Sequence, residues 1–295
     1  MGVKQSTMRS LFIAVLLIVS ATSLAQNSIN VTSWNIEWLS MHNGKVSRTN
    51  ADFEKLNHYV DKTQADVIAF QEVNSKSAIQ KVTGDDYTIY LSDRARIKNK
   101  PFQFSDINQY TGFAVRKGNT VTDSPDFSTS RGNRKLRFAS YIVINPKNEH
   151  ELHLLSVHLK AGCRAAYRNN QSCQILSQQG EALRKWMGKR EKNDEQYAVL
   201  GDFNHNLSYQ GDWLWAIMTR DNNAQLVTRN TKAECKVRSN KHSHKTHQFR
   251  SLIDHIIVSS KLKANNVHQT LFNSRDVLDY KLSDHCPINA TITFN

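Results

Sequence analysis

Eight short apolar segments recur along the chain, and five of them begin or end at clusters of acidic, amide or imidazole side chains. Short segments rich in Val, Ile, Leu and Phe are typical of β-strands. In the last segment Ile288, Ala290, Ile292 and Phe294 alternate with polar residues, which indicates a strand with one buried face. The predicted strands are 29–34, 67–70, 112–115, 138–144, 152–159, 198–200, 253–258 and 288–294.

Helical patterns separate some of these strands, at 51–60, 75–82 and 174–189, and Asn50 is the expected N-cap of the first helix. Residues 92–110 and 123–135 follow neither period, so we expect long surface loops there. Their basic side chains either contact a polyanion, which we favour, or only solubilise the surface. These side chains are Arg94, Arg96, Lys98 and Lys100 in the first loop, and Arg131, Arg134 and Lys135 in the second.

The N-terminal segment has the pattern of a secretory signal peptide. Lys4 and Arg9 precede an unbroken apolar run at 11–19, and the small residues around Ala25 form a cleavage site. The run is shorter than the about 20 apolar residues that cross a bilayer, so a retained anchor is only the alternative. We expect residues 1–25 to be removed, no stable membrane insertion afterwards, and a secreted or periplasmic protein.

The remaining residues, 26–295, are expected to form a single domain and a monomer, because no Gly/Ser/Pro-rich linker or repeat divides them. The chain has 39 Lys and Arg against 26 Asp and Glu; removing residues 1–25 takes away two basic residues and leaves a net charge of +11. A basic protein favours polyanions, and both nucleic acid and an anionic membrane surface fit.

Four cysteines in an exported chain suggest two disulfides, and four sites allow three pairings. We expect Cys163 to pair with Cys173, which closes a short loop after a predicted strand. Cys235 is then expected to pair with Cys286, which ties a basic loop to the C-terminal motif. No Cys-x-x-Cys motif occurs, which argues against a zinc or redox site.

The polar clusters contain the side chains that phosphodiester hydrolysis needs. Convergence at one rim of a sheet would gather carboxylates, amides and imidazoles, and such an oxygen-rich site suits Mg²⁺, with Mn²⁺ or Ca²⁺ as alternatives to it. Metal-held charge, a base and an acid together support attack by water on a phosphodiester. The residues concerned are Asn35, Glu37, Glu72, His158, Asp202, Asn204, Asp284 and His285.

The order of these motifs resembles that of the endonuclease/exonuclease/phosphatase superfamily. Trp-Asn-Ile-Glu, Gln-Glu-Val, a strand ending in His, Gly-Asp-Phe-Asn, Ile-Asp-His and Ser-Asp-His-Cys-Pro follow one another between residues 31 and 290. Each motif is weak alone, but six in this order are specific. The resemblance implies an α/β (α+β) four-layer sandwich, in which two packed mixed β-sheets are flanked by helices.

The resemblance also implies roles for the motif residues. Asn35, Glu37, Glu72 and Asp284 would hold the metal, with Glu72 as the primary ligand. The other roles belong to the reacting phosphate: Asp202 and Asn204 would contact it or its water, His285 would be the general base or stabilise the transition state, and Asp254 would orient His285.

Three further residues are carried over in the same way. His158 would be the general acid, Arg137 would grip a phosphate, and Tyr110 would face nucleic acid. The carboxylate that orients the first histidine in pancreatic-type deoxyribonucleases has no clear counterpart, and Asp106 is the nearest candidate.

These observations predict a secreted metal-dependent phosphodiesterase that cleaves nucleic acid, a DNA endonuclease that also accepts RNA. The alternatives are a phospholipid phosphodiesterase similar to sphingomyelinases, a phosphatase, or a non-catalytic binding module on the same scaffold. Lipid ranks second because the candidate loops carry few aromatic residues. Three histidines at 242, 244 and 247 are expected in a solvated loop, and Trp213 and Trp215 in the core.

Overall fold

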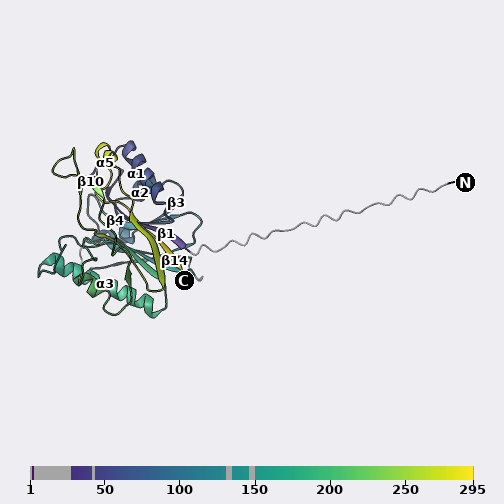
Figure 1. The fold of residues 1–295 in the computed structure, drawn as a ribbon, viewed down its shortest axis with the longest axis vertical. Coiled ribbons are helices and arrows are strands. Elements are labelled where there is room, and N and C mark those ends of the chain that lie inside the picture. The colour runs from purple at the N-terminus through teal and green to yellow at the C-terminus, as the bar shows by residue number, and fades with distance from the viewer. Residues whose placement is uncertain (1, 3–27, 42–43, 131–134, 146–149, 295) are drawn as a thin grey trace.

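Two six-stranded β-sheets packed face to face form the centre of the protein in a computed structural model (Figure 1). The structure describes residues 2, 28–41, 44–130, 135–145 and 150–294. The predicted signal peptide therefore lies outside the described residues, apart from Gly2. Among the residues described, no helix is long and apolar enough to cross a membrane.

The first sheet has the strand order β13-β14-β1-β2-β4-β3 and the second β5-β6-β7-β8-β12-β9. The first comprises β1 (Ser28–Leu39), β2 (Val67–Val73), β3 (Tyr87–Leu91), β4 (Tyr110–Arg116), β13 (Leu262–Gln269) and β14 (Ile288–Phe294). The second comprises β5 (Val121–Ser128), β6 (Phe138–Ile144), β7 (Leu152–His158), β8 (Tyr197–Asp202), β9 (Gln225–Leu226) and β12 (Asp254–Val258). A separate two-stranded hairpin pairs β10 (Lys236–Arg238) with β11 (Thr246–Gln248).

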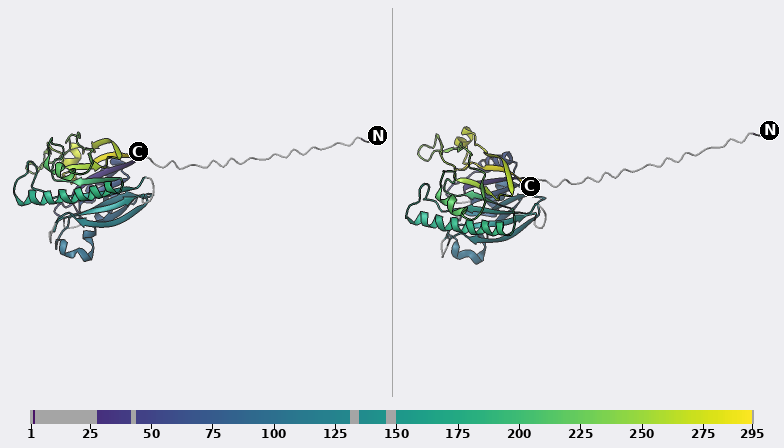
Figure 2. Two further views of the ribbon diagram at one scale, coloured as in Figure 1. Left: turned by 90° about the horizontal axis from the view of Figure 1, so that it is seen from below. Right: turned by 60° about the horizontal axis from the view of Figure 1, so that its bottom comes forward.

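Helices cover the outer faces of both sheets. Figure 1 shows α1 and α2 on one side of the stacked sheets and α3 on the other, and Figure 2 shows α3 running along the second sheet. Three apolar cores result: one between the sheets, one under α1 and α2, and one under α3 and α4. The expected four-layer sandwich is thus confirmed. The helices are α1 (Asn50–Thr63), α2 (Lys76–Thr83), α3 (Gln171–Lys192), α4 (Trp213–Met218) and α5 (Ser274–Asp279).

All eight predicted strands and all three predicted helices are present; β6 and β14 have the predicted bounds, and the ends of the other elements are shifted. The N-cap of α1 is Thr49 rather than Asn50, because Thr49 and Asp52 form a reciprocal capping box. The expected loop 123–135 begins as the edge strand β5, whose half-exposed residues give no apolar alternation. The expected loop 92–110 contains two short 3₁₀ turns, at 93–95 and 97–102.

The expectation that Arg94 contacts a polyanion is wrong. Arg94 is only 1% exposed, and its guanidinium donates to the carbonyl oxygens of Phe102 and Gln109 and to Oδ1 of Asn108. Burial lowers the pKa of Arg94 to about 10. Arg94 is therefore the internal support of this loop, while Arg131 and Arg134 lie outside the described residues.

The topology brings the motif residues to one rim. Strands β1 and β2 run parallel, as do β7 and β8, so the carboxyl ends of each pair lie at the same edge of their sheet. Strands β12 and β14 run antiparallel to β8 and β1 and begin at that edge, where Asp254 pairs in register with Asp202.

Gly201 makes room for this arrangement, because a Cβ there would lie 2.0 Å from the carbonyl oxygen of Val157 at a φ of +156°. We expect Gly201→Ala to lower the free energy of unfolding by at least about 2 kcal/mol, since β7 and β8 must separate. Gly188→Ala is the matched control: nothing lies within 4 Å of its added Cβ on α3, and about 0.5–1 kcal/mol of stabilisation is expected. Guanidinium unfolding measures both, and equal midpoints for Gly201→Ala and the wild type would contradict the argument.

Candidate active site

Strand ends at the rim are bent so that their side chains face a shared cleft. Glu37, Trp38, Glu72 and Asn204 all have left-handed backbones, with φ between 41° and 60°, a region that non-glycine residues seldom adopt. The ladder shifts register between Asn35 and Leu39 on β1, and again at the end of β2. Such bulges redirect side chains, and strained backbones of this kind gather at functional sites.

Asp202 lies at the centre of the site and joins the two sheets. Its Oδ2 accepts hydrogen bonds from Nδ2 of Asn35 at 3.0 Å and from Nδ2 of Asn204 at 3.3 Å, and its Oδ1 accepts from the Asn204 amide. The same Oδ2 lies 3.5 Å from Nε2 of His158 and 4.0 Å from Nε2 of His285. Burial raises the pKa of Asp202 to about 7, although His285 opposes the rise.

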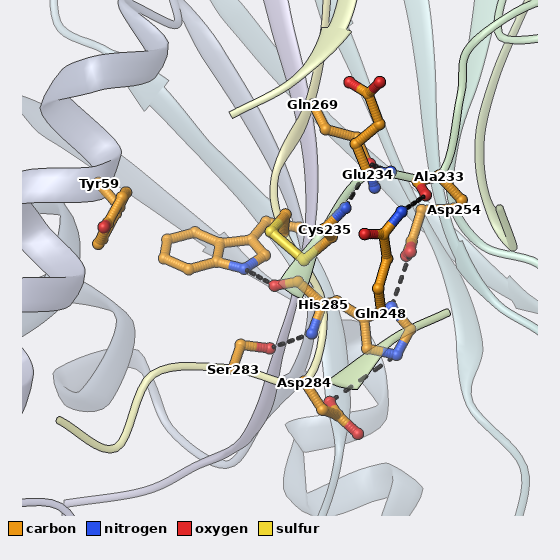
Figure 3. Close-up of a disulfide and its surroundings, with 12 residues drawn as sticks. Tyr59, Ala233, Glu234, Cys235, Gln248, Asp254, Gln269, Ser283, Asp284 and His285 are labelled. Atoms are coloured by element: carbon orange, nitrogen blue, oxygen red, sulfur yellow. Dashed lines mark hydrogen bonds and ion pairs between the residues drawn. A yellow bond between two sulfur atoms is a disulfide. The ribbon is translucent and has the colours of Figure 1, made fainter. Parts of the chain in front are cut away.

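His285 is held by contacts on three sides (Figure 3). Its Nδ1 lies 2.7 Å from Oδ2 of Asp254, its amide donates to Oγ of Ser283, and its carbonyl oxygen accepts from the Trp34 indole. Burial lowers the pKa of His285, but the charge and hydrogen bond of Asp254, aided by Asp202, outweigh it and raise the pKa well above its ordinary value. The raised pKa favours the protonated ring, whose Nε2 lies 4.0 Å from Oδ2 of Asp202.

His158 differs from His285 in both environment and charge. It is 5% exposed, and burial, with the charges of Arg137 and His285, holds its pKa well below the ordinary value. Its Nδ1 makes no hydrogen bond to any residue that the structure describes. The exposed Asp106 therefore does not orient it. The neutral imidazole sits with Nε2 3.7 Å from Glu72.

The predicted metal ligands form an acidic edge beside these histidines. Oε2 of Glu37 accepts from the Asp284 amide, and Oε2 of Glu72 accepts from the Trp38 amide. Burial raises the pKa of Glu37 to about 7, and the charges of Asp284 and Glu72 add to the rise. Mutual repulsion among oxygen donors is the condition that a hard divalent cation relieves, so these residues fit one.

One other group of ligand atoms is closer together. Asp202, Asp254 and His285 form a group whose possible ligand atoms all lie within 4.8 Å of one another. Within the described parts of the chain, it is the only such group of three or more His, Cys, Asp or Glu residues. Oδ1 of Asp254 is buried and has no hydrogen-bond partner in those parts. Glu37, Glu72 and Asp284 do not approach one another as closely.

The remaining predicted residues divide between the cleft and the core. The cleft has a volume of about 550 Å³ and is lined by Glu72, Arg137, His158, Asp202, Asn204, Asp254, Asp284 and His285. Arg137 donates to Oε1 of Gln109, and burial lowers its pKa. Tyr110 is 7% exposed and does not line the cleft; its ring lies under the guanidinium of Arg94.

One residue that supports the site, Arg48, carries no recognisable signal in the sequence. Arg48 follows no motif, yet it donates to the carbonyl oxygens of Ile36, Glu37 and Leu282 and so fastens the end of β1 to the segment before Asp284.

Both disulfides are formed as expected, Cys163–Cys173 and Cys235–Cys286, and the second adjoins His285. Oxidised pairs are typical of an extracellular or otherwise oxidising compartment. Trp213 and Trp215 pack against the core under α3, as expected.

Two packed mixed sheets with a rim of carboxylates and imidazoles define a scaffold of phosphoester hydrolases. The chain belongs to the endonuclease/exonuclease/phosphatase family, whose family model matches residues 32–285. The family inferred from the motifs is thus confirmed. A search of curated proteins finds no match.

Solved structures with this fold carry different activities in their names. A Bacteroides thetaiotaomicron protein of the same family has a TM-score of 0.63 at 14% identity, over 91% of this chain and 98% of that one. A mannosyl-6-phosphatase from the same species has a TM-score of 0.61 at 14% identity, over 90% and 100%. TDP2 from D. rerio, complexed with single strand DNA product, has a TM-score of 0.57 at 16% identity, over 90% and 99%. At these identities the likeness concerns the fold alone.

The contact between Asp254 and His285 makes a testable prediction for the metal-free protein. The His285 ring should titrate above its ordinary pKa of 6.5, and Asp254→Asn should move that titration down, whereas the exposed Asp106→Asn should not. Because the folded pKa is raised, the stabilisation from Asp254 is fully present below pH 6.5 and is lost as the pH rises through the folded value. Imidazole NMR titration in a chelator measures this, and equal His285 titrations in Asp254→Asn and the wild type would remove the ion pair.

Proposed function

We propose that the protein is an exported, monomeric, single-domain nuclease that hydrolyses phosphodiesters in DNA, and also in RNA, with a divalent cation. The observation that carries the proposal is the placement of Asp202 between two imidazoles whose pKa values are shifted in opposite directions, in a cleft that Glu72 and Asp284 also line. A secreted or periplasmic location accords with the two disulfides.

The charge states favour a definite division of roles. A pKa of about 7 lets the Asp202 carboxylate accept a proton from the attacking water at neutral pH. Protonated His285, which Asp254 holds in place, donates a hydrogen bond from Nε2 to the phosphate oxygen that gains charge, while the bond from phosphorus to the leaving oxygen breaks and that oxygen takes its proton from solvent. The motifs are compatible with His285 as a general base or as a stabiliser of the transition state. The raised pKa of His285 favours the role of transition-state stabiliser.

His158 and Arg137 complete this proposal. A neutral His158 has no imidazolium proton to give, so we assign it to orienting Asp202 through Nε2 rather than to the general-acid role expected from the motifs. Arg137 presents a guanidinium at the cleft and is suited to grip a phosphate oxygen. Asn204 holds the Asp202 carboxylate in place through hydrogen bonds from its backbone amide and its side-chain amide.

Asn35, Glu37, Glu72 and Asp284 are the residues proposed to hold the cation, with Mg²⁺ favoured and Mn²⁺ or Ca²⁺ as alternatives. A bound cation would supply charge stabilisation to the non-bridging phosphate oxygens. The preference for nucleic acid over small phosphomonoesters rests on the net charge of +11 without residues 1–25 and on the size of the cleft and of the hollow beside it. A DNA-bound relative in fold, TDP2, accords with this choice.

Supercoiled plasmid incubated with the purified protein and magnesium should be nicked, because endonucleolytic cleavage of one strand relaxes the circle. Chelator should stop the reaction, and manganese should restore it. Sphingomyelin vesicles and mannose 6-phosphate assayed beside the plasmid should be turned over far more slowly. Preferred hydrolysis of either would replace the nuclease proposal with a lipid phosphodiesterase or a phosphatase.

Replacing His285 by Ala should lower kcat on plasmid by about 10²–10⁴-fold, since the donor to the developing charge is lost. Asp202→Asn should remove the acidic limb near pH 7 from the pH–rate profile along with most activity, because that limb reports the carboxyl group. Lys263→Gln, at the far end of β13, is the matched control and should match the wild type. A His285→Ala enzyme with wild-type kcat would remove the proposed role.

A further inference from the structure

The cleft continues well past the reacting groups. It adjoins a second hollow of about 600 Å³, with which it has lining residues in common, and the two hollows together are called the groove below. The shared lining consists of Asn206, Ala233, Phe249, Arg250, Ser251 and Leu252. A single phosphate ester would leave most of this groove empty, which indicates a longer substrate.

Two arginines in the cleft lining are exposed and uncommitted. Arg164 lies in the loop after β7 and Arg250 in the segment after β11, and neither makes a hydrogen bond or ion pair with any residue in the described parts of the chain. Arg137, in contrast, is half-buried and bonded to Gln109. Guanidinium groups left free at a cleft wall suit bidentate contact with phosphate.

An aromatic side chain adjoins one of these arginines. Phe249 is 47% exposed, lines both hollows, and touches His247 edge to face at 4.9 Å between ring centroids. An exposed ring beside free cations is the combination on which unpaired bases stack. A membrane-inserting surface would instead join several apolar side chains, and the hairpin around Phe249 is rich in Lys and His.

Both of these segments are anchored by disulfides. Cys163, bonded to Cys173, precedes Arg164, and Cys235, bonded to Cys286, begins the hairpin that leads to Phe249. Figure 3 shows the Cys235 anchor beside His285, where Gln269 accepts from the Cys235 amide. Gln248 donates to the Ala233 carbonyl and fixes the strand end next to Phe249. Anchored contacts lose little conformational entropy on binding.

We propose that Arg164, Phe249 and Arg250 bind the substrate strand beyond the scissile phosphate, and that they give the protein a preference for single-stranded over duplex polynucleotide. The two guanidinium groups contact phosphates, and the Phe249 ring stacks on a base that is not paired. In a duplex the bases are already stacked on one another, so Phe249 would find no partner. The inference rests on the proposed nuclease function and adds to it the form of the nucleic acid and the residues that select it.

Strand binding is measured first, in chelator, by fluorescence anisotropy of a labelled oligonucleotide, so that turnover plays no part. The wild type should bind the single strand at least ten-fold more tightly than the same sequence as a duplex. Phe249→Ala should weaken binding of the single strand about ten-fold, with far less effect on an abasic strand of equal length, and Phe249→Trp should restore it. Arg164→Gln and Arg250→Gln should each reduce the salt dependence, as the slope of log K against log salt, by about 0.7. Lys263→Gln is the charge-matched control, with no change expected.

The second measurement compares kcat/KM on the single strand with that on bis(p-nitrophenyl) phosphate, in magnesium. The ratio should fall at least five-fold in Phe249→Ala and in Arg250→Gln. Equal binding of duplex and single strand, or losses in Lys263→Gln as large as in Arg250→Gln, would overturn the inference. A kcat/KM ratio that stays the same in Phe249→Ala and Arg250→Gln would also overturn the inference. If the wild type still hydrolyses the single strand in that case, the nuclease proposal is unaffected. A wild type that hydrolyses neither substrate yet shows the predicted binding contradicts the nuclease proposal alone.

Discussion

The hydrogen bond between Nδ2 of Asn35 and Oδ2 of Asp202, at 3.0 Å, joins the two sheets at the rim on which the site is built. Both side chains are almost fully buried, so either one left without its partner would carry the full penalty of an unsatisfied polar group. The Oδ1 of Asn35 also accepts from the Glu37 amide, and its carbonyl oxygen accepts from Ser283. Through its side-chain amide and its backbone carbonyl, Asn35 therefore fixes the positions of Glu37, Asp202 and the loop that carries His285 relative to one another.

Sequence pattern predicts this fold where apolar side chains run together or alternate up to the strand ends, as in β6 and β14, whose predicted bounds match the structure. It fails at β5 and β13, whose mostly exposed residues show no buried face. The rim was predictable because short polar motifs end apolar strands. The burial of Arg94 was not, since its acceptors, at Phe102, Asn108 and Gln109, come together only through the folding of a loop.

The pKa shifts of the two site histidines and of Asp202 could not be predicted from the sequence, for a related reason. Two histidines that look alike as strand-end motifs have pKa values shifted in opposite directions, because Asp254 raises the pKa of His285, whereas burial and the positive charges of Arg137 and His285 lower that of His158. Motif order identifies the groups, but the field at each group depends on its neighbours in space. Asp202, between them, gains a pKa near 7 from burial that no local sequence feature encodes.

The fold alone does not determine the substrate, since this chain shares it with a mannosyl-6-phosphatase and with a DNA-bound TDP2. The loops that carry Arg164 and Phe249 are the proposed source of selectivity in this chain. Each of these loops has a disulfide-bonded cysteine at its start, Cys163 or Cys235, and the partner of Cys235 is Cys286, the residue after His285. In the proposed complex, the Cys235–Cys286 disulfide would hold the start of the hairpin that leads to Phe249 beside the backbone of His285, and so would limit how far the base-binding segment can move from the reacting groups.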